Sequence, residues 1–353
     1  MDGYSDLKIS GPISAETFGD EVKEIPCSVM LLGPTGSGKS NVSLHLHQHS
    51  SHELLLIPTD FKFLECLVDD KNMGISKDSL ESVTQQVTAY RLRNVRTRRL
   101  FRDKVYIVDT PGVCDNNISE LRIIQEIQRW VNIHGSPKVV LYFHRITDKR
   151  LPGSQRRIIR LLEAISGEPS HSISWTGVVT TMWDNLLAHQ VASAENGFQQ
   201  LEAEHFKDIC TPGVESIFKF HNTQDSALAI VNKSLLNNIE TDLRYGLSTP
   251  PLRRYSEGWL RGGPFGKALY ELLEGRIAGL QQRLQILEDD IKNRDVLENP
   301  ELYAIFQRDK AEAEGMLREL EQERLEYLSL PEVPELPPST GRRIINYVKS
   351  KLS

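Results

Sequence analysis

Short apolar runs alternate with longer amphipathic stretches between residue 25 and about residue 245 of the chain. The six clearest runs predict strands over Ser28–Leu32, Thr88–Leu92, Val105–Val108, Val139–Phe143, Gly177–Thr180 and Ile217–Phe220. Strands that alternate with helical segments favour a mostly parallel sheet, because parallel neighbours need crossover helices. We therefore predict a three-layer α/β domain over residues 25–245, with a six-stranded sheet and helices on both faces.

The segments outside this domain have different patterns. Residues 1–24 are polar and contain Gly11-Pro12, so we expect an arm before the first strand. Residues 246–268 are rich in proline, glycine and arginine, which is typical of a linker. Over residues 269–330 apolar side chains recur every three or four positions and predict a coiled-coil-like helical hairpin broken at Pro300. Residues 331–353 form a proline-rich break and a short basic tail.

The apolar positions of the predicted hairpin are Ile277, Leu280, Leu284, Leu287 and Ile291, followed by Met316, Leu317, Leu320 and Leu328. This pattern fits packing within one chain and association between chains equally well, because the repeat breaks before four heptads accumulate. The sequence leaves both alternatives open.

Composition and charge restrict the class of protein. The chain of 353 residues is 39% hydrophobic and 25% charged, as in soluble globular proteins. Its formal net charge of -6 gives no overall attraction to nucleic acid or anionic membrane, so we expect no nucleic-acid partner and only a weak membrane contact through the basic tail. The four cysteines lack short paired spacings, and no apolar run approaches the roughly 20 residues that span a bilayer. A cytoplasmic location is the expectation.

A phosphate-binding loop is the strongest motif. The segment Gly33-Pro34-Thr35-Gly36-Ser37-Gly38-Lys39-Ser40 directly follows an apolar strand and matches the pattern of glycine, four residues, glycine, lysine and serine. Glycines let the backbone N–H groups turn inward, and a helix starting near Gly38 adds its positive end. Lys39 is expected to reach the β- and γ-phosphates, and Ser40 to ligate Mg²⁺. The predicted nucleotide contacts extend through Asn41.

A second segment, Asp109-Thr110-Pro111-Gly112, ends the predicted strand Val105–Val108. An acidic residue there can face the phosphate site across the sheet, so we expect Asp109 to act on Mg²⁺ through a water. The backbone N–H of Gly112 could contact the γ-phosphate, because no side chain blocks its approach. A plain turn after the strand is the alternative, but the loop about seventy residues upstream favours the nucleotide interpretation.

Three further stretches carry a family resemblance: Ser82-Val83-Thr84, Tyr142-Phe143-His144-Arg145-Ile146-Thr147-Asp148 and Thr180-Thr181-Met182-Trp183-Asp184. Together with the loop they resemble the septin-related branch of P-loop GTPases, in particular the AIG1-type proteins, the GTPases of immunity-associated proteins and their fungal relatives. The resemblance covers about residues 25–240. It implies GTP/GDP and Mg²⁺ as cofactors, with Thr84 covering the metal and the γ-phosphate.

The resemblance also implies a nucleotide-dependent homodimer, with Arg145 or His144 at the interface. Both residues could equally be polar residues that end a strand. Guanine recognition by Asn-Lys-x-Asp is reduced here to Thr181-Met182-Trp183-Asp184, in which only Asp184 matches. Its carboxylate can accept hydrogen bonds from guanine N1 and N2, although an N-cap role for Asp184 fits too. Asn222 is a candidate second base contact, and adenine stays open.

Hydrolysis is expected to be slow. Val113 follows Gly112 where Ras-like enzymes place the glutamine that orients the attacking water. We predict a guanine-nucleotide switch with low GTPase activity, served by Lys39, Thr84, Gly112 and Arg145, that acts on an unknown protein effector. The alternative is an interaction scaffold that binds nucleotide with little turnover.

Two clusters of basic side chains have no assigned function. Four histidines, His45, His47, His49 and His52, follow the loop, and we expect solvated or packed histidines there in preference to a metal site. The cations Arg91, Arg93, Arg96, Arg98, Arg99, Arg102 and Lys104 gather around a predicted hairpin of strands. A solvated hairpin is favoured, and contact with phospholipid or an acidic partner is the alternative.

Overall fold

In a computed structural model of the chain, the described residues are 7–18, 22, 25, 27–39, 63–69, 86–97, 104–113, 119–135, 137–148, 175–206, 215–245, 261 and 263–330. The chain divides into two compact units. The first comprises Met1–Ile118 and Arg122–Arg253, and the second comprises Ser119–Leu121 and Arg254–Ser353. Each unit is described by itself.

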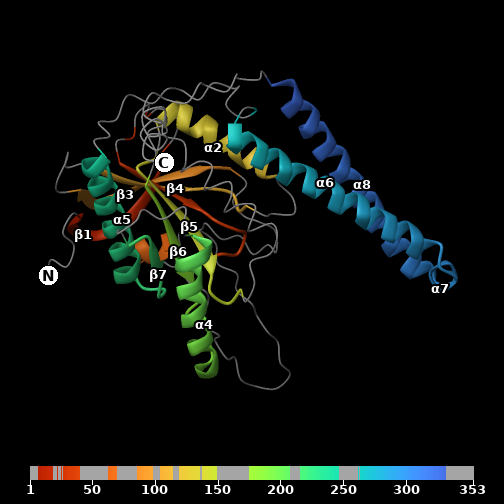
Figure 1. The fold of residues 1–353 in the computed structure, drawn as a ribbon, viewed down its shortest axis with the longest axis horizontal. Coiled ribbons are helices and arrows are strands. Elements are labelled where there is room, and N and C mark those ends of the chain that lie inside the picture. Colours follow the sequence, from red (N-terminus) through yellow and green to blue (C-terminus); the bar gives the residue numbers. More distant parts are fainter. Residues whose placement is uncertain are drawn as a thin grey trace, which may run out of the picture. The chain divides into compact units, whose positions relative to one another are not determined.

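The first unit is built on a seven-stranded sheet in the order β1-β3-β4-β2-β5-β6-β7 (Figure 1). Its strands are β1 (Leu7–Thr17), β2 (Ser28–Leu32), β3 (Thr88–Thr97), β4 (Lys104–Asp109), β5 (Val139–Arg145), β6 (Trp175–Thr181) and β7 (Ile217–Lys219). The neighbouring strands β4, β2, β5, β6 and β7 pair in parallel in that order, whereas β3 is antiparallel to both β1 and β4. The mostly parallel α/β sheet is therefore confirmed.

The first strand was not predicted. The arm expected over residues 1–24 contains β1, which pairs with β3 at the edge of the sheet and raises the number of strands to seven. Its burial pattern is irregular and its register shifts between Ile9 and Ser14, because Gly11 and Pro12 interrupt the strand. The regular alternation that identifies a strand in sequence is therefore missing.

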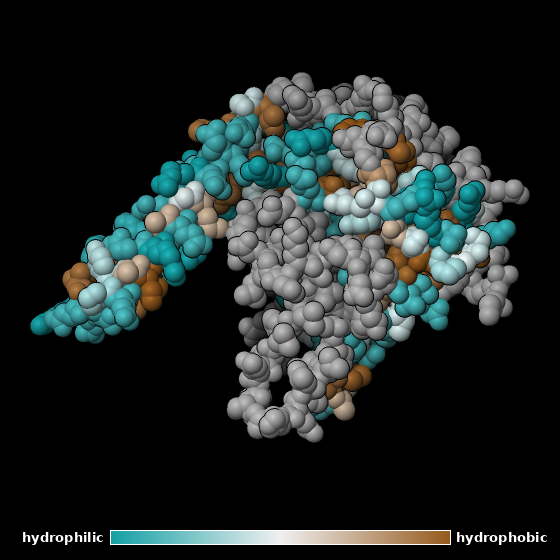
Figure 2. Space-filling model, turned by 180° about the vertical axis from the view of Figure 1, so that it is seen from behind, coloured by the Kyte–Doolittle hydropathy of each residue, from teal (hydrophilic) through white to brown (hydrophobic). Residues whose placement is uncertain are grey.

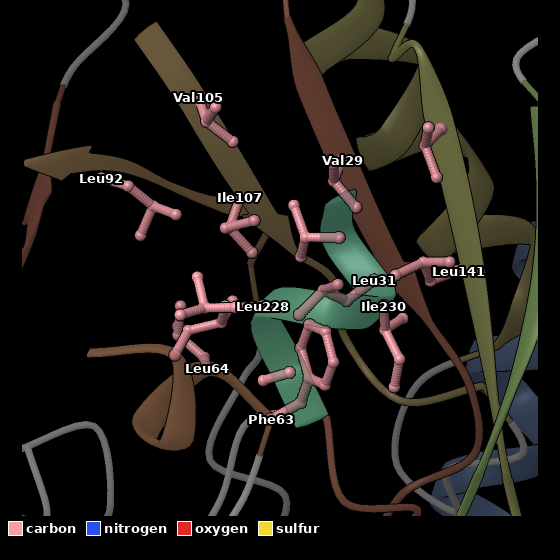
Figure 3. Close-up of a cluster of buried hydrophobic side chains, with 14 of the residues drawn as sticks. Val29, Leu31, Phe63, Leu64, Leu92, Val105, Ile107, Leu141, Leu228 and Ile230 are labelled. Carbon is pink, nitrogen blue, oxygen red and sulfur yellow. The ribbon is translucent and has the colours of Figure 1, made fainter. Parts of the chain in front are cut away.

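One face of the sheet is covered by α1 (Phe63–Val68) and α5 (Gln224–Tyr245), which also contact each other. Buried aliphatic side chains from β2, β4 and β5 meet Phe63 and Leu64 of α1 and Leu228 and Ile230 of α5 there (Figure 3). Phe63 also makes edge-on ring contacts with Phe143 and Phe220, at centroid distances of 5.1 and 5.2 Å. This core fixes the carboxyl end of β2, where the predicted phosphate-binding loop begins, and that of β5, the neighbouring strand.

Side chains of the central strands that point away from this core lie on the other face of the sheet. The helices on that face are α2 (Glu120–His134) and α4 (Ala188–Gln200), and α4 continues into the short π-helix η1 (Leu201–His205). Phe206, which ends η1, is fully buried with its ring 5.9 Å from that of Tyr142 in β5. Helices on both faces are as the sequence predicts, because β2 and β6 are buried along their whole length and β5 along most of it.

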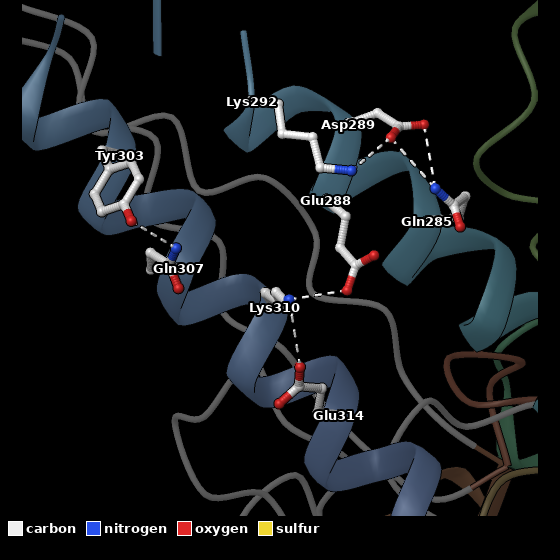
Figure 4. A network of polar contacts seen from close by, with 8 residues as sticks. All are labelled: Gln285, Glu288, Asp289, Lys292, Tyr303, Gln307, Lys310 and Glu314. Atoms are coloured by element: carbon white, nitrogen blue, oxygen red, sulfur yellow. Dashed lines mark hydrogen bonds and ion pairs between the residues drawn. The ribbon is translucent and has the colours of Figure 1, made fainter. Parts of the chain in front are cut away.

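The second unit contains two long helices, α6 (Gly263–Ile291) and α8 (Pro300–Ser329), joined through the short helix α7 (Arg294–Leu297). The helices α6 and α8 lie side by side in opposite directions. Tyr270 stacks on Tyr327 near one end, and Lys310 pairs with Glu288 at 2.9 Å toward the other (Figure 4). Asn299 caps α8 by accepting a hydrogen bond from the Leu302 N–H. Figure 2 shows that the surface of these helices is mostly hydrophilic, with small apolar patches.

Two sequence expectations for this unit need correction. The linker predicted over residues 246–268 overlaps α6, which begins at Gly263, because Gly263 and Pro264 form its first turn, where proline is tolerated. Leu328 was expected in the apolar seam, yet it is 42% exposed and Tyr327 is buried in its place. Residues 331–353 lie outside the described residues. No described helix is both long enough and apolar enough to cross a membrane.

Candidate nucleotide-binding site

The loop Gly33–Lys39 leaves the carboxyl end of β2, between β4 and β5. Gly36 and Gly38 adopt left-handed backbone conformations, with φ of 75° and 89°, which residues with a side chain rarely adopt. The Ser37 N–H donates to the Pro34 carbonyl at 3.1 Å and closes a tight turn. The sequence therefore curls at this point because glycines stand at the two positions that require them.

Two other glycines are required by close packing. A Cβ at Gly33 would lie 2.8 Å from the Phe143 carbonyl oxygen. A Cβ at Gly112 would lie 2.8 Å from the backbone N of Thr35. Both distances are shorter than non-bonded contacts allow, so no other residue fits without movement. The structure thus brings Gly112, predicted from a separate segment, against the phosphate-binding loop.

Val113 joins the two segments through its backbone. Its N–H donates to the Gly33 carbonyl at 3.0 Å, and its carbonyl accepts from the Thr35 N–H at 3.3 Å. The Thr110 hydroxyl adds a third link by donating to the Leu31 carbonyl at 2.7 Å. In the sequence, Val113 is notable only because it stands where Ras-like enzymes place a glutamine. Its backbone role depends on the tertiary fold and has no sequence signal.

The charged residues of this region are buried. Lys39 is 4% exposed, and Asp109, the last residue of β4, is 1% exposed. Burial raises the pKa of Tyr90 to about 12, and the negative charge of Asp109 acts in the same direction. Asp109 lies at the end of β4, directly beside the strand that leads into the loop.

The segment predicted to recognise the base is tied to the loop by Thr181. Its hydroxyl donates to the Ser37 carbonyl at 2.9 Å, although we had regarded Thr181 only as a departure from the usual asparagine. Its position in the motif was the signal that could have identified it. Next to it, Met182 has a left-handed φ of 63°. Such strained backbone is frequent at functional sites.

Asp184 and Asn222 come together although 38 residues separate them. The Asn222 side-chain amide donates to Asp184 Oδ2 at 2.7 Å; Asp184 is exposed and Asn222 is half-buried. Asn222 also has a left-handed φ of 51°. The N-cap alternative for Asp184 is wrong, because α4 begins later and its N-cap is Leu187.

Trp183 and Lys219 support this edge of the site. The Trp183 ring N–H donates to the Thr180 hydroxyl at 3.0 Å. Lys219 Nζ lies 4.6 Å from the centre of the Trp183 ring and 2.5 Å from Glu195 of α4. The contacts of Lys219 connect β7 to Trp183 and to α4, so no local sequence pattern predicts them.

Arg145 and His144 have opposite environments at the end of β5. The Arg145 side chain is 36% exposed, pairs with Asp148 at 3.2 Å, and approaches within 3.9 Å of the position of a Cβ on Gly36. The His144 side chain is buried near Phe206, and this burial lowers its pKa to about 4. An interface role for His144 is therefore wrong, because the side chain cannot reach a partner.

The arrangement fits a nucleotide in three respects. The glycine loop supplies a backbone cradle that a Cβ would fill, the buried Lys39 and Asp109 can act on phosphate and metal, and the buried Ser37 hydroxyl has no hydrogen-bond partner among the described residues. Ser40, Asn41, Thr84 and the predicted helix after Gly38 lie outside those residues, as do the four histidines. Within the described part of the chain no cluster of three metal-ligating side chains occurs.

No protein-family profile and no curated protein matches the chain. Solved structures that resemble it include one of the chloroplast translocon components atToc33 and psToc159, for which dimerisation is described as important for the GTPase activity, with 14% identity and a TM-score of 0.38. Toc33 from Arabidopsis thaliana in complex with GDP and Mg²⁺ has 12% identity and a TM-score of 0.35. These two alignments cover 62% and 61% of this chain and 84% of each of those chains.

The cytosolic domain of L. pneumophila FeoB aligns over 83% of this chain and 88% of that chain, with 12% identity and a TM-score of 0.29. Similarities this distant do not assign a function to the chain.

Proposed function

We propose that this chain is a Mg²⁺-dependent guanine-nucleotide-binding protein of the P-loop GTPase class, in its AIG1-type, septin-like branch. The observation that carries the proposal is the convergence on one end of the sheet of the loop Gly33–Lys39, the Asp109–Val113 segment and the Asp184–Asn222 pair. These segments are distant in sequence, and their chemistry suits phosphates, a metal and a base respectively.

Each group has a defined task in this proposal. Backbone N–H groups of the loop and the Lys39 ammonium bind the β- and γ-phosphates, while Ser40, Thr84 and Asp109 hold Mg²⁺, directly or through water. Magnesium, when bound, neutralises charge that develops during phosphoryl transfer. Gly112 brings its N–H to the γ-phosphate, and Asp184 with Asn222 contacts the base.

Slow hydrolysis follows from position 113. Valine has no group to orient a water, so the chain supplies positioning and charge but no polarising side chain there. Arg145, half-exposed beside Gly36, is available to a second copy bound across the nucleotide face. Loss of the γ-phosphate then releases Thr84 and Gly112, which changes the surface offered to an effector.

A second candidate is a nucleotide-bound scaffold with little turnover, in a cytoplasmic setting, with α6 and α8 as a coiled-coil working surface. The backbone bonds of Val113 to Gly33 and Thr35 favour it, because they hold the segment that follows Gly112 against the loop, whereas a switch must release that segment. An ATPase is the third candidate, since two of the three defined base-motif positions, Thr181 and Met182, depart from the usual pattern. Multiple-turnover phosphate release from GTP and ATP separates the three.

Replacing Lys39 by alanine tests the phosphate site. We expect affinity for GTP and GDP to fall about 100-fold, because a charge-assisted contact to phosphate is lost. Calorimetric titration in Mg²⁺ measures the loss, with Lys292→Ala, an exposed lysine of the second unit, as control. Equal affinities of Lys39→Ala and wild type would overturn the assignment of the loop.

Replacing Asp184 by asparagine tests the base contact. The amide can donate where the carboxylate only accepts, so we expect preference to shift from guanine toward xanthine nucleotides by about tenfold or more. Competition between GDP and XDP against a fluorescent nucleotide measures the ratio. An unchanged ratio would show that Asp184 does not contact the base, whatever the affinity for phosphate.

A further inference from the structure

Three cationic side chains form a row across neighbouring strands. Lys8 of β1 lies directly opposite Arg96 of β3, which lies directly opposite Lys104 of β4, and all three residues are exposed. We call these residues the basic row. Lys104 precedes Asp109 by five positions in β4, or ~16 Å along a strand, so the row is separate from the nucleotide site.

The row lies on the face of the sheet away from the buried cluster. Its members are adjacent in sequence to three residues of that cluster, Leu7, Val95 and Val105. Because successive side chains of a strand point to opposite faces, the cations point away from the cluster. Directly opposed residues share a face, so the three cations stand next to one another.

No acidic group of the described residues neutralises the row. Arg91 and Arg93, further along β3, both pair with Glu16 of β1. Lys8, Arg96 and Lys104, in contrast, have neither an ion pair nor a hydrogen bond to any side chain that the structure describes. Like charges directly opposite each other destabilise a sheet, and the fold itself gains nothing from this arrangement.

We propose that the basic row is a docking surface for an acidic helical segment of a partner protein. Adjacent strands are ~4.8 Å apart, and side chains three or four positions apart on a helix have Cβ atoms ~5–6 Å apart. Three glutamates along one helix face therefore match Lys8, Arg96 and Lys104 one for one. The proposal is independent of the nucleotide site and goes beyond the proposed function.

The row fits a membrane or a nucleic acid less well. Ile9 is the exposed large hydrophobic residue of β1, and it alternates with Lys8, so it points to the opposite face. Three cations without an apolar side chain give only marginal binding to an anionic surface. Tyr90 and Tyr106, the aromatic residues of β3 and β4, are buried and unavailable for stacking on bases.

The test uses the full chain and a fluorescein-labelled, alanine-based helical peptide with glutamate at every fourth position. The row variant is K8Q/R96Q/K104Q, and the matched control K292Q/R294Q/R308Q removes three exposed cations of the second unit. By fluorescence anisotropy we expect the row variant to bind the peptide about tenfold more weakly than wild type, and the control to bind unchanged. Raising salt should weaken wild-type binding.

Folding is checked by thermal melting, in which the row variant should match wild type or melt about 2 °C higher at low salt, because repulsion is removed. If it melts lower, the single variant R96Q serves in its place. Equal loss in the row and control variants, or equal binding of a glutamine version of the peptide, would overturn the proposal. So would row-dependent binding of phosphatidylserine vesicles or a 20-base-pair DNA without peptide binding.

Discussion

At the scale of single residues, burial decides which polar groups can act. His144 and Arg145 are adjacent in sequence, yet one is enclosed beside Phe206 and the other is half-exposed beside the phosphate-binding loop. Strand alternation sends neighbouring side chains to opposite faces, so adjacent polar residues need not share a function. His144 Nδ1 has no hydrogen-bond partner among the described residues, which makes the charged imidazole costly.

His144 predicts a pH dependence of stability. Burial lowers its folded pKa from 6.5 to about 4, opposed by the Asp148 charge and supported by those of Arg145 and His205, so the unfolded chain takes up a proton first as pH falls. Its contribution is complete above pH 6.5 and is lost between pH 6.5 and 4, with a total of about 3 kcal/mol.

Urea unfolding at a series of pH values measures this loss. In His144→Phe the free energy of unfolding should fall less steeply over that range than in wild type, whereas His189→Gln, at an exposed histidine, should follow wild type. Parallel curves for His144→Phe and wild type would mean that His144 does not titrate with unfolding.

At the scale of elements, the ends of strands and helices position the site. The carboxyl ends of β2, β4, β5 and β6 meet at one edge of the sheet, which brings Gly33, Asp109, Arg145 and Thr181 together. In the second unit, side-chain contacts along α6 and α8 hold the two helices together. Tyr327 is 4% exposed, stacks on Tyr270, and donates its hydroxyl to the Gly266 carbonyl at 2.8 Å.

Removing that hydroxyl should loosen the helix pair. Tyr327→Phe removes the hydrogen bond from the hydroxyl to the Gly266 carbonyl, and we expect a loss of about 1 kcal/mol in the stability of the second unit. The midpoint of urea unfolding, followed by far-UV circular dichroism, measures it. Tyr303→Phe is the control, since that residue is exposed and its hydroxyl accepts a hydrogen bond from the Gln307 side chain. Equal effects of the two substitutions would contradict the assigned contact.

At the scale of the whole molecule, the proposed function predicts association that depends on nucleotide. The mass of the protein, measured by light scattering, should rise with protein concentration in a non-hydrolysable GTP analogue. In GDP it should stay at the mass of the monomer. Arg145 belongs to this prediction because its guanidinium lies beside Gly36 and is accessible. A second copy can thus place charge near the phosphates of the first.

Arg145→Ala should keep nucleotide affinity but remove the rise in specific GTPase activity with protein concentration. Arg129→Ala, which removes an exposed arginine of α2, is the control. A monomer in both nucleotide states would contradict the dimer, and an activity that falls in Arg145→Ala without any concentration dependence would place Arg145 in its own site.

The sequence by itself determined the central strands, the glycine loop and the alternation that makes the domain α/β. These features are local: apolar runs identify buried strands, and glycines mark positions where only they fit. The seventh strand was missed because Gly11 and Pro12 disrupt its pattern and its stability comes from pairing with β3. The start of α6 was misplaced for a similar reason, since glycine and proline there begin a helix.

Only the tertiary structure decided which distant residues meet. The Asp184–Asn222 contact, the Thr181 bond to Ser37 and the backbone bonds of Val113 all join segments that follow different strands. The basic row is visible in sequence as scattered lysines and arginines, but the register of β1, β3 and β4 aligns three of them. Strand register and crossover order depend on packing across the whole sheet, so no local pattern specifies them.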